Sequence, residues 1–322
     1  MKGLTLRQLR TFAEVARHLS FVRAAEALHL TPPAVTMQIK ELETLLGLQL
    51  LVRRGRQVSL TTAGEYLTFH VRRILATVKD AEDAMARFRG ADSGLLSIGL
   101  VGTAKYFVPQ LLARFREAHP GVELRMRIGG NREQLVAMLA ANEIDLAIMG
   151  RPPRELATRS EPFAAHPLVF IAGAGHPLAT SGEPVTPRAL AHWPCLAREP
   201  GSGTRKVMED YFEARRIEPH LAMEMPSNEI IKQAVIAGMG ISFLSLHTLG
   251  LELRTGLLRI LDVEGTPVVR TWNLVHRLSK VLSPAAEAFR YFMLSEAEPF
   301  LRAQDEALLG APAIAHARDD AD

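Results

Sequence analysis

Hydrophobic residues in the first fifty positions recur every three or four residues, a spacing that predicts three short amphipathic helices. The first helix has an apolar stripe made of Leu6, Leu9, Phe12 and Ala16. The second covers residues 21–28 and follows Ser20, whose hydroxyl can accept a hydrogen bond from a free N–H of the first turn. We expect Thr31 to cap the third helix in the same way and Gly47 to end it. Two short helices joined by a tight turn predict a helix-turn-helix, a motif that reads DNA.

The third predicted helix has two unlike faces. Its apolar positions are Val35, Ile39, Leu42 and Leu46. The opposite face, near the N-terminal end of the helix, carries Pro33, Thr36, Met37 and Lys40. Since the N-terminal part of a recognition helix enters the major groove, we predict that these last four residues contact DNA. The alternative is an ordinary three-helix packing unit.

A short hairpin is predicted after the third helix, with strands at 50–52 and 57–60. Its tip holds Arg53, Arg54 and Arg56, and three crowded cations favour an anionic partner. The phosphate backbone of DNA is the natural anion, so the hairpin is predicted to be a wing that contacts phosphates. A solvated surface turn is the alternative. Residues 1–61 are thus predicted to form a winged helix-turn-helix domain.

The next predicted element is a long helix that starts at Thr62 and continues to about residue 92. Its apolar positions step by four and three residues, which gives a heptad seam through Leu67, Val71, Ile74, Val78, Ala81 and Met85, with Phe88 as the next step. A period of 3.5 residues favours a partner helix, so the sequence predicts a linker helix that forms a homodimer. Docking of this helix on its own chain is the alternative. Residues 90–94 are predicted to be a linker.

From residue 95 the pattern changes to alternating strands and helices, which predicts parallel, doubly wound α/β structure. The first series has strands at 95–101, 122–128 and 145–149, and a second begins at 168–172. We predict two similar lobes of the periplasmic-binding-protein type, with the chain crossing between them twice. Lobe I is assigned 93–162 and 268–300, and lobe II is assigned 163–267. Residues 301–322 end in alanine-rich and acidic sequence and are predicted to be a disordered tail.

Composition narrows the location and the partners. The chain has 322 residues and a formal net charge of +3, and the excess of Lys and Arg lies in the first 92 residues, as expected for a DNA-binding part. No apolar run is long enough to span a membrane and no signal-peptide core is present, which predicts a cytoplasmic protein without membrane contact. The single cysteine, Cys195, excludes intrachain disulfides and is interpreted as a buried small hydrophobe, with a redox sensor as the alternative.

The whole chain resembles the LysR-type transcriptional regulators. The resemblance is carried by segments 6–12, 20–21, 24–30, 33–43 and 60–64. Pro32 stands where the family usually has glutamine, and Met37 where an arginine or another polar residue is frequent. The resemblance implies a double-stranded DNA operator, a homodimer that assembles as a dimer of dimers (a homotetramer), and RNA polymerase as a further candidate partner.

The second half narrows the resemblance to the CbbR subgroup, which controls Calvin-cycle carbon-dioxide-fixation operons including those for RuBisCO. Segments 103–109 and 142–153 are the discriminating ones. The subgroup implies a transcriptional activator with no cofactor that senses a small anionic effector. Candidate effectors are a sugar phosphate, phosphoenolpyruvate, ATP and NADPH. A LysR-type regulator of a different metabolic operon is the alternative.

The residues themselves also predict an anion site. In two-lobed α/β proteins, ligands bind at the carboxyl ends of strands, in the crevice between lobes. Five loops fall there, and helix starts within them offer free N–H groups to anions. The predicted effector-binding residues are Thr103, Lys105, Asn131, Arg151, Gly203, Thr204, Arg205 and Asn228. The alternative is that these residues only form turns and caps.

Three other classes of protein were weighed. An enzyme is disfavoured because the sequence has no HExxH, no Gly-x-Ser-x-Gly and no paired carboxylates with suitable spacing. A solute-binding protein shares the two-lobed architecture but lacks a winged helix. A protein-binding adaptor could use the same winged helix, and a steep salt dependence of DNA binding would argue against it. No metal site and no catalytic residue are predicted.

Overall fold

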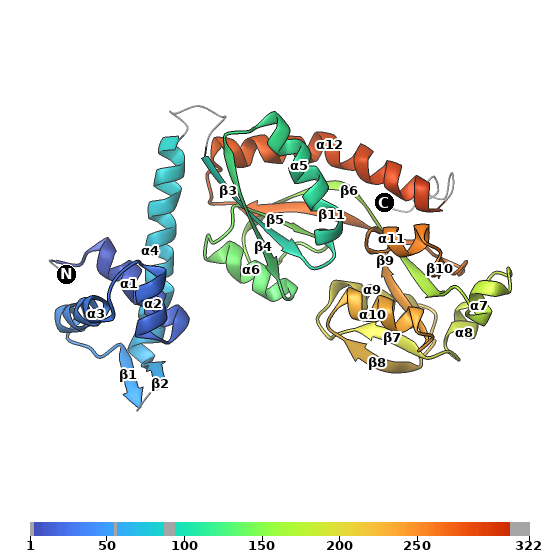
Figure 1. Cartoon of the computed structure of the whole chain (residues 1–322), viewed down its shortest axis with the longest axis horizontal. Helices are drawn as coiled ribbons and strands as arrows, with labels where there is room; N and C mark the ends of the chain where they lie inside the picture. The colour runs from blue at the N-terminus through green and yellow to red at the C-terminus, as the bar shows by residue number, and fades with distance from the viewer. Residues whose placement is uncertain (1–2, 55–56, 87–93, 310–322) are drawn as a thin grey trace. The chain divides into compact units, whose positions relative to one another are not determined.

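A computed structural model describes residues 3–54, 57–86 and 94–309 (Figure 1). The chain divides into two compact units, residues 1–85 and 86–322. Arg56, Phe88, the predicted linker up to residue 93 and the tail from residue 310 lie outside the described residues. Within the described residues, no helix combines the length and the apolar character that a bilayer crossing requires.

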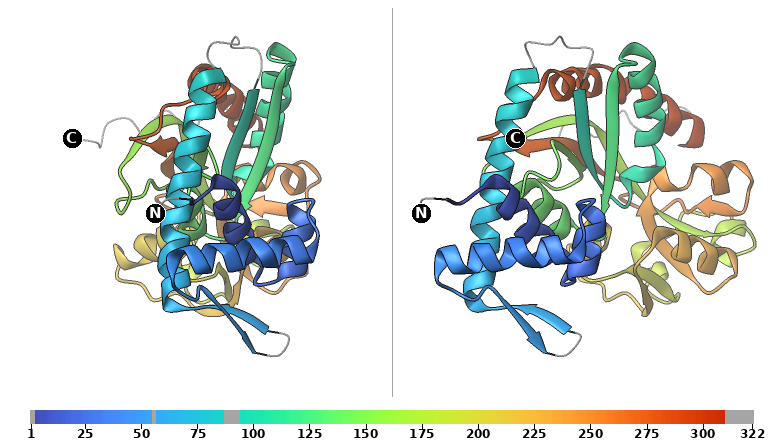
Figure 2. Two further views of the ribbon diagram at one scale, coloured as in Figure 1. Left: turned by 90° about the vertical axis from the view of Figure 1, so that its left-hand side faces the viewer. Right: turned by 60° about the vertical axis from the view of Figure 1, so that its left-hand side comes forward.

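The first unit is a winged helix-turn-helix followed by a long helix. Its elements are α1 (Leu6–His18), α2 (Phe21–Ala27), α3 (Pro32–Leu46), β1 (Leu51–Arg54), β2 (Gln57–Leu60) and α4 (Thr62–Ala86). The apolar stripes of the three short helices meet in one core that includes Phe12, Val15, Val35 and Leu42, all fully buried. The antiparallel hairpin β1–β2 extends away from these helices (Figure 2). The predicted winged helix-turn-helix is therefore confirmed.

The helix ends were predicted with one error. Ser20 caps α2 by accepting a hydrogen bond from the N–H of Arg23, and Gly47 ends α3 with φ of 66°. Thr31 occupies the N-cap position of α3 but makes no capping hydrogen bond through its side chain. The prediction for Thr31 is therefore wrong. Pro33, at the second helical position, has no N–H to donate, and the Thr31 side chain accepts no hydrogen bond from Ala34, the remaining candidate donor.

Helix α4 presents its heptad positions to two different surroundings. Val71 is fully buried in the core of the first unit, and Leu67 packs partly against the same core. Ile74, Ala81 and Met85 are exposed, Met85 by 60%. The assignment of Val71 to a dimer seam is therefore wrong, because the beginning of the helix closes the core of its own unit. Only the later heptad positions remain available to a partner.

Lobe I of the second unit has a parallel core sheet. Strand β3 (Gly94–Val101) pairs in parallel with β4 (Val122–Gly129) and β5 (Leu146–Met149). The short 3-10 helix η2 (Ala104–Tyr106), α5 (Val108–Ala118) and α6 (Arg132–Ala140) connect these strands. The alternation of parallel strands with helices matches the doubly wound pattern that the sequence predicts.

Lobe II repeats this arrangement around β7 (Cys195–Arg198), which pairs in parallel with β8 (Leu221–Met225) and β9 (Ile241–Ser245). Helices α9 (Gly203–Glu213) and α10 (Asn228–Ile236) follow β7 and β8. Five further short elements have no counterpart in the predicted pattern: α7 (Pro177–Thr180), α8 (Pro187–Leu190), η3 (Leu246–Thr248), α11 (Gly250–Arg254) and β10 (Leu258–Ile260).

Two long antiparallel strands join the lobes. They are β6 (Thr158–Gly173) and β11 (Val268–Arg277), and the sheet order is β4-β3-β5-β11-β6-β9-β7-β8, with β10 on β6 (Figure 1). The prediction placed the start of β6 at residue 168 and missed its first ten residues. Those residues are a mixture of polar and apolar types without a clear alternation, because β6 passes from one lobe into the other.

Helix α12 (Pro284–Leu309) contradicts the predicted disordered tail as far as residue 309. Buried positions recur every four residues at Phe289, Met293, Ala297, Leu301 and Asp305, and the helix continues through Pro299. A proline in a helix interior removes one backbone hydrogen bond, but the packing of this continuous stripe offsets the loss. The side chain of Asp305 lies 3.1 Å from Nε2 of His247, so the end of α12 is attached to lobe II.

Candidate functional site

The outer face of α3 is an open groove with little charge. It is lined by Pro32, Pro33, Thr36, Met37, Lys40, Glu41, Thr44 and Leu45. All four residues predicted to face DNA are in this set, and Met37 is 58% exposed. The helix is fixed from behind by a buried hydrogen bond of 2.6 Å from Thr11 Oγ1 to Gln38 Oε1. The surface is therefore presented on a rigid support, while its side chains remain free for contact.

Arg53 and Arg54 are the last two residues of β1 in the wing. Arg53 pairs with Val58 and Arg54 with Gln57 in the register of β1 and β2. The base of the wing is attached to α3, because Glu43 Oε1 accepts hydrogen bonds from the N–H groups of Leu50 and Leu51. The wing and α3 thus form one unit.

A cavity of about 580 Å³ lies between the two lobes, at the carboxyl ends of the central strands. The predicted residues Thr103, Asn131, Arg151, Gly203 and Thr204 all line it. Asn131 caps α6 through its side chain, and Thr204 lies in the first turn of α9 and is 7% exposed. The rule that ligands bind where parallel strands end therefore identified five residues that the fold brings together.

Three predicted effector residues do not line the cavity. Arg205 is engaged in lobe II, because its guanidinium contacts Glu209 at 2.6 Å, Glu224 at 2.8 Å and the carbonyl of Arg198 at 3.0 Å. The ammonium of Lys105 lies over the ring of Tyr106, 5.1 Å from its centroid. These two predictions failed because both side chains turn back onto their own lobe.

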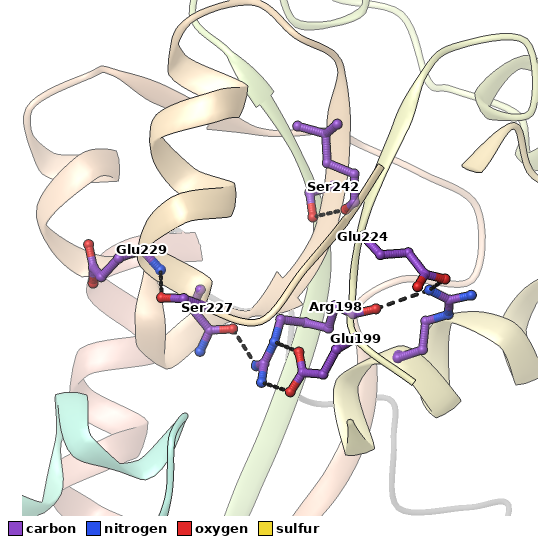
Figure 3. Close-up of polar contacts among 9 residues, drawn as sticks. Arg198, Glu199, Glu224, Ser227, Glu229 and Ser242 are labelled. Carbon is purple, nitrogen blue, oxygen red and sulfur yellow. Dashed lines mark hydrogen bonds and ion pairs between the residues drawn. The ribbon is translucent and has the colours of Figure 1, made fainter. Parts of the chain in front are cut away.

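Asn228 is the third of these residues, and it contacts a residue of the cavity lining rather than the cavity itself. Its Oδ1 accepts a hydrogen bond of 2.7 Å from Arg198, which does line the cavity. The same guanidinium makes two further hydrogen bonds of 2.7 Å to the carboxylate of Glu199 (Figure 3). Arg198 is therefore held in one orientation by two residues, and its side chain is 10% exposed. Two N–H groups of the guanidinium are thus engaged by Glu199.

The charges around the cavity favour an anion. Six cationic side chains line it, against the two carboxylates Glu199 and Asp210; the six are Arg132, Arg151, Arg154, Arg198, Lys206 and Arg270. Each carboxylate is already paired, Glu199 with Arg198 and Asp210 with Lys206 at 2.8 Å. Arg151, Arg154 and Arg270 make no ion pair within the described part of the chain. The cavity thus has unneutralised positive charge.

The floor of the cavity is a stack of aromatic rings. His166 is 7% exposed and lies parallel to Trp272, with ring centroids 3.9 Å apart. Trp272 Nε1 donates a hydrogen bond of 3.0 Å to Nδ1 of His247. Burial lowers the pKa of His166 well below its usual range, and the nearby Arg270 acts in the same direction. His166 is therefore neutral in the empty cavity.

A polar network outside the cavity lining also connects the two lobes. Tyr106 of lobe I donates a hydrogen bond of 2.5 Å to Glu229 of lobe II, and the buried Lys232 lies 2.9 Å from Glu229 and 2.8 Å from Glu252. Burial, followed by the hydrogen bond to Glu229, raises the pKa of Tyr106, so the phenol stays protonated and keeps donating. Glu229 follows Asn228 in the chain, so this contact between lobes adjoins the support of Arg198.

Two expectations about other sites can be compared with the structure. Cys195 is 1% exposed beside Met208, and burial raises the pKa of its thiol to about 12, as expected for a small hydrophobic side chain. Among the residues that the structure describes, no group of three His, Cys, Asp or Glu side chains could hold a metal ion.

The sequence analysis missed several residues of the cavity. Arg198 is the last residue of β7, so the rule applied to the other strand ends could have found it. His166, Arg270 and Trp272 lie within β6 and β11, the strands that cross between lobes. No signal pointed to them, because they reach the cavity only through strand pairing, in which His166 is opposite Arg270.

Comparisons with protein families match nearly the whole chain. The family described as "Bacterial regulatory helix-turn-helix protein, lysR family" matches residues 6–65, and the family described as "LysR substrate binding domain" matches residues 89–298. The second match alone covers more than half of the chain and includes every residue that lines the cavity.

Similar proteins are named as regulators. The transcriptional regulator CfxR of Cupriavidus necator is 53% identical, covering 94% of this chain and 94% of its own. CbbR of Rhodospirillum rubrum is 50% identical (91% of this chain, 96% of its own), and the RuBisCO operon transcriptional regulator of Allochromatium vinosum is 48% identical (91% and 97%).

Solved structures agree on the fold. The regulatory domain of CcmR from Synechocystis, in complex with 2-PG, is 37% identical with a TM-score of 0.60, covering 63% of this chain and 97% of its own. Full-length CbnR in complex with its target DNA has a TM-score of 0.67 at 24% identity, covering 90% of this chain and 99% of its own. The CbnR likeness shows the fold only.

Proposed function

This chain belongs to the LysR family of transcriptional regulators, and from that premise we propose that it controls carbon-dioxide-fixation genes in response to a phosphorylated metabolite bound between its lobes. DNA binding follows from the family. The target genes are inferred from relatives that are named RuBisCO operon regulators and cover more than nine tenths of this chain.

The observation that supports a phosphorylated effector best is the unneutralised charge of the interlobe cavity. Arg151, Arg154 and Arg270 face it without an ion pair from the described residues, and Thr103 and Thr204 add hydroxyl donors. Charge-assisted hydrogen bonds to a phosphate are about twice as strong as neutral ones, so these groups favour an anion over a neutral sugar. The 2-PG bound to the related CcmR domain is an anionic metabolite.

The two lobes supply different parts of this site. Thr103, Asn131 and Arg151 come from lobe I, and Arg198 and Thr204 come from lobe II. A ligand that contacts both sets stabilises one lobe arrangement over another, which is the differential affinity that a switch requires. We infer that closure is transmitted to the contact between Tyr106 and Glu229, because Glu229 adjoins the support of Arg198.

The first unit supplies the DNA contacts in this proposal. Thr36, Met37 and Lys40 on α3 read the groove, while Arg53, Arg54 and Arg56 of the wing contact phosphates. The protein acts in the cytoplasm. It forms a dimer through the exposed heptad positions of α4, which are Ile74, Ala81 and Met85, and two such dimers assemble on DNA. RNA polymerase is the partner that an activator would contact.

A thermal-shift screen tests the effector class. A ligand that binds only the folded state raises the melting temperature, so the full chain is screened against 2-phosphoglycolate, phosphoenolpyruvate, ribulose bisphosphate, ATP and NADPH. Glycolate, which lacks the phosphate, is the matched control compound. We expect stabilisation by at least one phosphorylated compound and none by glycolate. Equal stabilisation by 2-phosphoglycolate and glycolate would contradict an anion site built for phosphate.

A further inference from the structure

His166 has an unusual position for a polar side chain. It is 7% exposed on the floor of the interlobe cavity, and neither Nδ1 nor Nε2 has a hydrogen-bond partner among the described residues. Buried polar atoms in native proteins are nearly always hydrogen-bonded, since an unmade bond costs free energy. A side chain that lines a cavity with two unpaired nitrogens therefore points to a ligand that supplies the partners.

The ring is held in its orientation from behind. It stacks on Trp272 at an interplanar angle of 16°, and Trp272 is fixed by its hydrogen bond to Nδ1 of His247. Since Nδ1 of His247 accepts this bond, the ring proton of His247 is on Nε2, which faces Asp305 at 3.1 Å. Gly150 leaves the space in front, because a Cβ there would lie 3.2 Å from Nδ1 of His166. The empty cavity thus presents a fixed imidazole.

The charged groups around His166 keep it neutral until a ligand arrives. On β11, Arg270 is its partner in the strand register, and Arg151 follows Gly150 after β5. The carboxylates of the cavity are occupied by other cations, Glu199 by Arg198 on β7 and Asp210 by Lys206 on α9. From α12, Asp305 faces His247 rather than His166. Every charge close to the ring that is not already paired is positive, which opposes protonation in the empty cavity.

We propose that His166 contacts the anionic group of the effector and that binding takes up one proton, which is held between the imidazole and the anion. A neutral imidazole offers one donor and one acceptor, whereas a phosphate dianion offers acceptors only. A ring nitrogen without its proton and a phosphate oxygen are both acceptors, so they cannot hydrogen-bond to each other where they meet. A proton from solvent joins them, carried either by the ring nitrogen or by a phosphate oxygen that donates to the ring. Both arrangements bind the same number of protons, and no covalent bond forms or breaks.

This inference rests on the proposed phosphorylated effector and adds a pH dependence to it. In the empty cavity the pKa of His166 is low, and the bound anion raises the proton affinity of the site. Between these two limits, binding strengthens as pH falls and weakens as pH rises, by up to about tenfold in affinity per pH unit for one linked proton. The regulator would then report the effector and the pH of its surroundings together.

Calorimetry of the full chain with 2-phosphoglycolate tests the proposal. Titrations are run between about pH 7 and 8.5, above the second phosphate pKa of about 6, so that the free ligand is already a dianion. At each pH, buffers with different ionisation enthalpies are compared, because proton uptake makes the observed heat depend on the buffer. We expect the parent protein to take up close to one proton and its affinity to fall by up to about tenfold per pH unit.

The variant His166→Gln keeps one donor and one acceptor but does not titrate. We expect it to bind with no proton uptake and with an affinity that is constant over this pH range. Thr103→Val, in the same cavity, should bind more weakly but retain the proton uptake of the parent. If the variant fails to fold, the proton uptake measured with the parent protein is sufficient to test the proposal. Binding by the parent without proton uptake, or equal uptake in His166→Gln, overturns this inference and leaves the proposed function standing. A parent that binds no phosphorylated compound overturns both.

Discussion

The DNA-facing surface of α3 and the interlobe cavity are built in opposite ways. The first comes from a single helix of 15 residues, whose outer side chains are exposed and mostly without partners on their own chain. The second collects side chains from segments between Val101 and Trp272, and several of these side chains are buried or already paired. A substitution on the outer face of a single helix leaves the neighbouring contact residues in place. The shape of the cavity, in contrast, depends on how the two lobes are positioned.

The two regions also differ in how they hold charge. Lys40 lies on an open groove beside Glu41, where water screens both. Arg198 is 10% exposed and locked between Glu199 and Asn228, where desolvation makes each partner matter more. The effects of substitutions on the α3 surface should therefore be separable, whereas those in the cavity should be coupled to one another.

The largest expected effect is on stability, from a substitution that should unfold the first unit and leave the second unit folded. Val71→Asp places an unpaired charge in the core of the first unit, where Val71 is fully buried, and should destabilise that unit by at least about 3 kcal/mol. We expect loss of DNA binding while the second unit still binds the effector, measured by differential scanning calorimetry and effector titration. Tyr66→Asp, at a 73% exposed position of the same helix outside the heptad seam, is the control and should leave the unit folded. An unchanged unfolding transition in Val71→Asp would show that the core is assigned wrongly.

The next effect is confined to the cavity. Thr103→Val and Thr204→Val should each weaken effector binding by about 1–3 kcal/mol, because each removes a charge-assisted hydrogen bond. DNA binding without effector should be retained, since the first unit is untouched. Thr180→Val, at an exposed site in lobe II outside the cavity lining, is the matched control. If calorimetry finds parental affinity in both cavity variants, the effector binds elsewhere.

On the DNA side, the wing and α3 should behave differently. Arg54→Ala should weaken binding about equally for all sequences and reduce the salt slope by roughly one unit, because it removes a phosphate contact. Thr36→Ala should instead reduce the preference for a selected operator over random DNA. Fluorescence anisotropy titrations at several salt concentrations measure both. A loss of sequence preference in Arg54→Ala with an unchanged salt slope would reverse the two roles.

The smallest expected effect is an increase in effector affinity rather than a loss. Glu199 is the carboxylate that pairs with Arg198, so Glu199→Gln should free the guanidinium for the ligand and strengthen effector binding by up to about 1 kcal/mol. Asp210→Asn, which acts on the exposed Lys206, is the comparison variant and should change affinity less. Weaker binding in Glu199→Gln would mean that the carboxylate orients Arg198 for the ligand rather than competing with it.

What the sequence could predict follows the same division. The face of α3 was predicted residue by residue, because helical periodicity separates its buried from its exposed positions. In the cavity, Thr103, Asn131 and Thr204 were predicted because a rule links strand ends to ligand sites. His166 was not, since it reaches the cavity only through the pairing of β6 with β11, which no local pattern reveals.

The errors have a common physical cause. Arg205 and Lys105 were assigned by charge and position, but their long side chains found partners in their own lobe. Val71 satisfied the heptad pattern and Leu301 followed a proline, yet both are buried by contacts distant in sequence. For Arg205, Lys105 and Val71 the local pattern identified the element, whereas for Leu301 it missed the helix; in all four cases tertiary packing decided what the side chain contacts.

The central claim, that an anion bound between the lobes alters DNA binding, is tested most directly by footprinting. The parent and Arg270→Met are compared on an operator selected by the protein from random DNA, with and without saturating 2-phosphoglycolate. We expect both proteins to protect the operator without ligand, and we expect the ligand to change the footprint of the parent only. A footprint of the parent that does not respond to the ligand, or an equal response in Arg270→Met, would contradict it.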